Sequence, residues 1–254
     1  MKTAEIAGFF DDLLELPKFA ADCSNNGLQI CFDKMAPCRK IAFAVDASQA
    51  SIDQAIAGNA DMLVVHHGLS WGPGVRRWDG ITGRRLGAAF KNDLALYAVH
   101  LPLDAHAVYG NNAVLSDLIR LGERQMFFPY CGIEIGMIGQ IEPSAPESVA
   151  RAAAAGKEYK MYISPLKDSP VQKIAVISGG AGMDGLAAAI EEGADMLITG
   201  EFDHTMYHLV QENAIHVAAL GHYASEVHGV KALQKLLTEK FGLETVFLDI
   251  PTGL

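Results

Sequence analysis

The feature that most constrains the fold is an internal repeat: a stretch of about 50 residues in the first half of the chain recurs in the second. Lys40 begins the segment KIAFAVDASQASIDQAIAGNADMLVVHH, and Lys173 begins KIAVISGGAGMDGLAAAIEEGADMLITGE. The tetrapeptide ADML starts at Ala60 and again at Ala194, so one residue has been gained between the copies. Apolar residues keep the same phase in both copies, which is hard to obtain by chance, and the repeat therefore predicts two related units.

Each copy has the pattern of apolar runs that is typical of alternating strands and helices. In the first copy, apolar runs predict strands at 40–45 and 63–65, separated by a helix that Ser48 or Asp46 can cap. The same alternation predicts an N-terminal helix, further strands at 28–32 and 94–99, and a helix at 82–92. The predicted fold class is therefore α/β, with two duplicated units whose mostly parallel sheets are flanked by helices. The boundary is expected near Tyr130, dividing the chain into residues 1–130 and 131–254.

Composition excludes several classes of function. The net charge of −10 argues against a general nucleic-acid or anionic-membrane surface, because phosphate binding needs a concentration of Lys and Arg. No run approaches the roughly 18 apolar residues of a membrane span. The four cysteines show no CxxC and no disulfide-framework spacing, so we interpret them as structural and expect a cytoplasmic location.

Two adjacent histidines end the second strand of the first copy. His66 and His67 follow the apolar run, and Gly68 opens a loop. Ligands of open α/β sheets bind at this edge of the sheet. Successive strand residues point to opposite sides, so both imidazoles serve one site only if the backbone turns or if they hold two neighbouring ions. The alternative is one capping and one core histidine.

The repeat places further polar residues at equivalent strand ends. His100 and Asp104 follow the fourth strand of the first half, and His222 and Glu226 follow its counterpart in the second half. If the strand edges of the two units meet, a metal site forms there from three imidazoles and two carboxylates: His66, His67, Asp104, His222 and Glu226. This donor set suits two divalent ions, such as Zn, Fe or Mn, about 3.5–4 Å apart. The alternative is that Glu226 complements a helix N-terminus and His222 caps it.

These motifs resemble one known family. HHGL, HLPLDAH followed by GNNAVL, TGEFDH and GHYASE are similar to the dinuclear-metal proteins called NGG-interacting-factor-three-like, or GTP cyclohydrolase 1 type 2 homologs, of the short bacterial type. The resemblance runs over nearly the whole chain. It implies metal ligation by the five residues above, with Glu226 bridging two ions, and a toroidal homohexamer built as three dimers.

Other residues at these edges are candidates for moving protons. Glu201 and His204 occupy the second-half position equivalent to His66 and His67, and His100 leaves the matching strand of the first half. The alternative for Glu201 and His204 is a charged pair beside a helix cap. Ser178–Gly182, SGGAG, can offer backbone N–H groups to a phosphate, but its counterpart DASQA favours a plain turn.

Four arginines follow the two histidines: Arg76, Arg77, Arg84 and Arg85, interleaved with Trp71 and Trp78. In an acidic chain they either draw an anionic substrate and stack its planar base or form a salt-bridged oligomer surface.

Two functions remain open from the sequence. The first is a metal-dependent hydrolase that uses a metal-activated water on a nucleotide-like or other small anionic heterocyclic substrate. The second is a non-catalytic metal-binding assembly or metal-handling protein.

Overall fold

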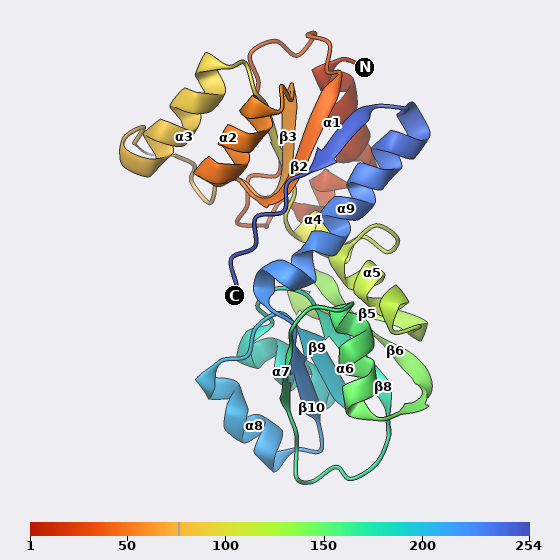
Figure 1. The fold of residues 1–254 in the computed structure, drawn as a ribbon. Coiled ribbons are helices and arrows are strands. Elements are labelled where there is room, and N and C mark those ends of the chain that lie inside the picture. Colours follow the sequence, from red (N-terminus) through yellow and green to blue (C-terminus); the bar gives the residue numbers. More distant parts are fainter. Residues whose placement is uncertain (76) are drawn as a thin grey trace. The chain divides into compact units, whose positions relative to one another are not determined.

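The computed structural model describes residues 1–75 and 77–254, and the chain forms two compact units (Figure 1). The first unit comprises Met1–Leu103 and Val230–Ile250, and the second comprises Asp104–Gly229 and Pro251–Leu254. The sequence-based boundary near Tyr130 lies in the turn of a hairpin, between β5 (Gly122–Tyr130) and β6 (Ile133–Ser144), which pair antiparallel. Because β5 is hydrogen-bonded to β6, the residues just before Tyr130 pack with the second unit.

The first unit contains a five-stranded sheet in the order β1-β4-β3-β2-β11. Strands β2, β3, β4 and β11 are mutually parallel, and only β1 pairs antiparallel, at the β4 edge. The strands are β1 (Gly27–Ile30), β2 (Lys40–Asp46), β3 (Met62–His67), β4 (Ala95–Ala98) and β11 (Glu244–Phe247). The helices are α1 (Thr3–Leu13), η1 (Leu16–Phe19), α2 (Gln49–Ala57), α3 (Gly80–Lys91), α4 (Leu101–Ala105) and α9 (His222–Phe241), of which the last two also contain residues of the second unit.

Helices cover both faces of this sheet, as Figure 1 shows. Helices α2 and α3 bury Ile52 and Leu86 in one apolar cluster with alternate strand residues such as Leu63 and Val65. On the other face, α1 packs beside the C-terminal part of α9, where the rings of Phe9 and Phe241 meet edge to face. Strands buried on both faces are expected to be continuously apolar, which explains the runs detected in the sequence.

The second unit contains a six-stranded sheet in the order β5-β6-β8-β9-β10-β7. Its central strands β8, β9 and β10 are parallel, whereas β5, β6 and β7 add antiparallel pairs at the two sides. The remaining strands are β7 (Lys160–Tyr162), β8 (Val171–Ile177), β9 (Met196–Thr199) and β10 (His216–Ala219). The helices are α5 (Asn111–Leu118), α6 (Pro146–Ala154), α7 (Gly182–Glu191), η2 (His204–Met206) and α8 (Tyr207–Glu212). Helices α5 and α6 share one apolar cluster with β8, β9 and β10.

The two parallel strand triplets confirm the repeat. In the first unit, Asp61 Oδ2 accepts hydrogen bonds from the backbone N–H groups of Arg39 and Lys40, at 2.7 and 3.0 Å. In the second, Asp195 Oδ2 accepts from Gln172 and Lys173, at 2.8 and 2.9 Å. The aspartate of each ADML segment thus fixes the start of the preceding strand. The prediction of duplicated α/β units is confirmed at the level of individual hydrogen bonds.

Among the described residues, no helix combines the length and the apolar character that a membrane span requires.

The turn after the two histidines depends on a glycine. A Cβ atom at Gly68 would lie 2.5 Å from the Ala98 Cβ and from the amide end of Gln29. Gln29 Oε1 also accepts from the N–H groups of Leu69 and Ser70, at 2.8 and 3.1 Å, so its side chain cannot move away without losing these bonds. Gly68 therefore lets the chain leave β3 close against β4 and β1.

We expect Gly68→Ala to lower the free energy of unfolding by about 1–3 kcal/mol, the usual cost of overpacking. Gly87→Ala is the matched control, because its Cβ meets nothing within 4 Å in the middle of α3. This control should be neutral or more stable by up to about 1 kcal/mol, through helix propensity. Urea unfolding measures both, and equal stability of the two variants would contradict the packing argument.

Candidate functional site

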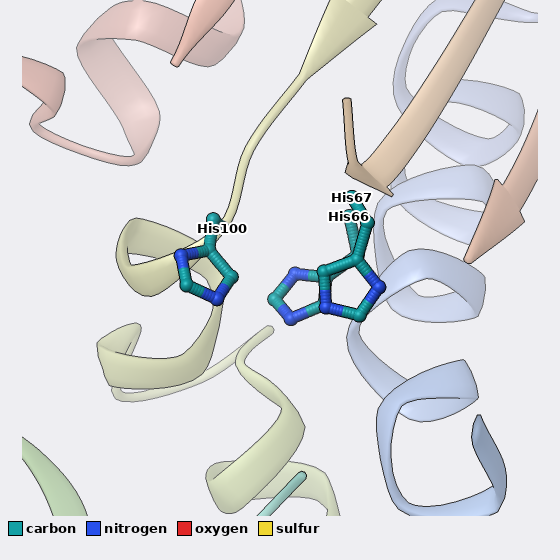
Figure 2. A group of neighbouring side chains, drawn as sticks. All are labelled: His66, His67 and His100. Atoms are coloured by element: carbon teal, nitrogen blue, oxygen red, sulfur yellow. The ribbon is translucent and has the colours of Figure 1, made fainter. Parts of the chain in front are cut away.

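Three histidines of the first unit gather at the C-terminal ends of β3 and β4. His66 and His67 end β3, and His100 follows β4 (Figure 2). One ligand nitrogen from each lies within 4.8 Å of those of the other two. The ring centroids are 4.6 Å apart for His66 and His67, 5.2 Å for His66 and His100, and 5.7 Å for His67 and His100. We call these three residues the histidine group.

Each ring of the histidine group is held at its Nδ1 atom by an oxygen. His66 Nδ1 lies 2.9 Å from the carbonyl oxygen of Val99, and His67 Nδ1 lies 2.9 Å from Asp46 Oδ1. His100 Nδ1 lies 2.9 Å from Asp22 Oδ1. A carbonyl or carboxylate oxygen only accepts, so each Nδ1 donates, and the neutral imidazole then carries its lone pair on Nε2.

These hydrogen bonds also explain how the side chains of two successive strand residues reach the same site. His66 is held toward β4 by the carbonyl of Val99, whereas His67 is held toward β2, where Asp46 is its register partner in the parallel pair. His66 is fully buried and the side chain of His67 is 21% exposed. Both rings are thus held by oxygens at the ends of the two strands that flank β3.

Asp22 is the anchor that organises the loop before β1. Its Oδ1 accepts from Ser24 N and His100 Nδ1, and its Oδ2 accepts from Asn26 Nδ2 and Leu101 N, all at 2.8–3.0 Å. Burial raises the pKa of Asp22, but the bonds from His100 and Asn26 outweigh it and hold the pKa below its usual value. Asp22 is therefore an ionised acceptor that fixes the His100 ring.

In the second unit, Asp104 is a buried carboxylate held by two donors. Asn111 Nδ2 and Ser178 Oγ donate to its Oδ1, at 2.8 and 3.0 Å, and Asp104 itself is 5% exposed. Asn112 ties the same region together, because its Oδ1 accepts from Ser178 N at 2.7 Å. Asp104 is thus fixed in position by side chains of α5 and of the turn after β8.

The first turn of α9 carries a histidine between two carboxylates. His222 Nδ1 lies 2.6 Å from Glu201 Oε1, and His222 Nε2 lies 3.1 Å from Glu226 Oε1. Glu226 is 3% exposed, whereas the Glu201 side chain is 54% exposed. The bond to Glu226 is the largest cause that raises the pKa of His222, to about 9, and Glu201 adds to it while burial opposes it. In the absence of a metal, His222 is an imidazolium at neutral pH.

Glycines make room for this arrangement. Gly179 has φ +63°, and a Cβ there would lie 2.3 Å from Glu226 Oε1. A Cβ at Gly200 would lie 2.6 Å from Ser225 Oγ and 2.9 Å from the Cα of His222. Ser225 Oγ accepts from Gly179 N and donates to His222 O, at 2.9 and 2.8 Å. The SGGAG segment is therefore a tight turn that packs against α9, and two of its N–H groups are taken by Asn112 and Ser225.

Other predicted residues lie at the surface or outside the described part of the chain. His204 lies exposed in η2. Arg77 and Arg84 are exposed, and Trp78 is 65% exposed. Arg76 lies outside the described residues.

Sequence reasoning missed the residues that orient the candidate ligands. Asp46 ends β2 as His67 ends β3, so the register of two parallel strands was a usable signal. Asp22 had only the turn-forming DCSNNG segment as a signal, and its bond to His100 spans 78 residues. Cys23 was interpreted as structural; it is an exposed residue and belongs, with Asp22 and His100, to a second group whose ligand atoms are within 4.8 Å of one another.

Known proteins resemble this chain over its full length. The model of the Duf34/NIF3 (NGG1p interacting factor 3) family matches residues 1–253. Proteins of Archaeoglobus fulgidus and Pyrococcus horikoshii, both named GTP cyclohydrolase 1 type 2 homolog, are 44% identical over 254 and 261 residues and cover 100% of each chain. The crystal structure of TTHA1606 from Thermus thermophilus has a TM-score of 0.84 at 33% identity and covers 100% of both chains.

We expect His222 to titrate at about 9 in the metal-free protein. Because this pKa is raised above the ordinary 6.5, the pairing stabilises the fold fully below pH 6.5, and the contribution is lost as the pH rises through about 9. Glu226→Gln should lower the pKa toward 6.5, and Glu239→Gln, an exposed change on the same helix, should not. NMR titration of labelled histidines measures this, and a His222 pKa near 6.5 in the parent chain would contradict it.

Proposed function

Because the chain belongs to the Duf34/NIF3 family, we propose that it is a dinuclear metal-binding protein that acts as a metal-dependent hydrolase on a small anionic, nucleotide-like substrate. We assign the ligand role to His66, His67, Asp104, His222 and Glu226, for two divalent ions such as Zn, Fe or Mn. The activity follows the name of the relatives, and reducing cytoplasm is the proposed location, in keeping with four free cysteines.

The observation that carries the metal assignment is the anchoring of the histidine group. Histidines that ligate metals almost always donate their second ring N–H to a carboxylate or a backbone carbonyl. The two assigned ligands His66 and His67 both do so within the first unit, and His100 is oriented in the same way. The donor set of neutral imidazoles and carboxylates fits divalent ions of the zinc, iron and manganese class.

The chain's own residues then have distinct roles. Bound ions would supply an activated water and polarise the bond that is attacked. Of the three groups proposed to move protons, His100 has the strongest support, because the hydrogen bond to Asp22 orients its ring. Glu201 holds Nδ1 of His222 and is better described as a positioning residue, while His204 is supported by sequence alone. Arg77 and Arg84 are proposed to attract the substrate anion.

The first experiment measures metal content. After anaerobic purification and reconstitution, elemental analysis should find about two ions per chain. Glu226→Ala should lose both, because this buried carboxylate is the proposed bridge, whereas the control Glu239→Ala should keep them. Trace metal in the reconstituted parent chain would refute the assignment.

The same holoprotein is then screened with nucleotides, pterin precursors and phosphoesters. We expect turnover that a chelator abolishes and added metal restores. Activity that survives complete metal removal would refute the mechanism. A metal-loaded protein that turns over none of these compounds would instead support the non-catalytic metal-binding protein.

We also propose a closed homo-oligomer, as the family resemblance implies, with a toroidal hexamer as the specific form. Light scattering at micromolar concentration should give the mass of several chains. A monomer would refute the proposal, and a dimer would refute the hexamer.

A further inference from the structure

The GNN segment of the sequence contains two asparagines whose side chains are fully buried. Asn111 and Asn112 open α5, and both are 0% exposed. A buried amide is costly unless its donor and its acceptor both find partners. In Asn111 each end of the amide has one: Nδ2 donates to Asp104 Oδ1 at 2.8 Å, and Oδ1 accepts from Gly229 N at 2.7 Å. Asn111 therefore joins Asp104 to α9.

The two partners of Asn111 fix the orientation of its amide. A backbone N–H can only donate, so the oxygen of the amide faces Gly229 and the NH₂ group faces Asp104. An ionised aspartate has the same shape as asparagine but no donor, and glutamine is one methylene longer. Asparagine is therefore the side chain that fits both contacts.

Asn111 also links the two buried carboxylates of the second unit. One oxygen of Asp104 and one of Glu226 lie within 4.8 Å of each other, and the two residues are 5% and 3% exposed. Two ionised carboxylates at this distance repel each other, and burial weakens the screening of their charges by water. Glu226 lies three residues before Gly229, on the same face of α9. The contacts from Asp104 through Asn111 to α9 therefore hold the two carboxylates together.

We propose that Asn111 is a positioning residue that holds the Asp104 carboxylate beside Glu226 for a divalent cation. The inference rests on the proposed metal-binding function, and it assigns a role to a residue outside the donor set. Without the amide, repulsion moves the Asp104 carboxylate away from Glu226 in the metal-free chain, and binding of the cation has to draw it back. This reordering opposes binding, so the affinity for the cation falls.

The test measures the affinity of the full chain and of single variants for Zn²⁺, by competition with a coloured chelator. Asn111→Ala should bind Zn²⁺ about 10–100-fold more weakly, the usual effect of removing a group that orients a metal ligand. Leu115→Ala is the matched control, because it truncates a fully buried side chain of the same helix, in the apolar cluster of the second unit. This control should lower the free energy of unfolding in urea and leave the affinity for Zn²⁺ unchanged. The same urea curves establish that each variant is folded under the conditions of the titration.

The outcomes separate this inference from the proposed function. Equal affinities of the parent chain and Asn111→Ala for Zn²⁺ would overturn the positioning role and leave the metal assignment standing. An equal loss of affinity in Leu115→Ala would also overturn it, because general destabilisation would then explain both variants. If Asn111→Ala does not fold, Asn111→Ser is measured with the same expectation, since its smaller side chain leaves room for a water at Gly229 N. No binding of Zn²⁺ by the parent chain would refute both proposals.

Discussion

The hydrogen bond at Nδ1 of each clustered histidine is the interaction on which the candidate site depends. An imidazole on a free side chain rotates and exists as two tautomers, and only one of these presents a lone pair at Nε2. The Val99 carbonyl, Asp46 and Asp22 remove both freedoms for His66, His67 and His100. The rings are therefore oriented before any cation arrives, and binding does not have to offset the entropy of ordering them.

The repeat shows that the two related α/β units carry different residues at the same strand ends. By the alignment of the ADML segments, Gly200 occupies the position of His66 and Glu201 that of His67. A side chain at Gly200 would collide with Ser225 and His222, so the start of α9 takes the space that an imidazole uses in the other unit. The histidine of the second unit comes instead from the helix, and Glu201 holds its Nδ1 atom. The strand ends diverged while the aspartates that fix the strand starts stayed the same.

Much of the fold could be predicted because it follows local patterns. Strands that are buried on both faces are short apolar runs, and Ser48 caps α2. The repeat predicts the three parallel strands of each unit. The pairing of β11 with β2 could not be predicted, because it joins strands about 200 residues apart and has no repeat counterpart. The candidate ligand positions of β3 and α9 were visible as histidines at element ends. Asp22, which orients His100, was not visible, since a loop carries no periodic pattern that predicts where its side chains point.

The second unit buries two carboxylates and offsets part of the electrostatic cost of burying them. Removing a carboxylate from water is costly unless it is paired or hydrogen-bonded, and the cost is greater for several like charges. Asp104 and Glu226 are both buried, at 5% and 3% exposure, in a chain of net charge −10. The chain offsets part of this cost with neutral donors to Asp104 and with the protonated ring of His222 beside Glu226. A proton on His222 and a divalent cation compete for the same nitrogen and stabilise the same carboxylate, so the raised pKa of His222 measures how strongly this pair of side chains attracts positive charge.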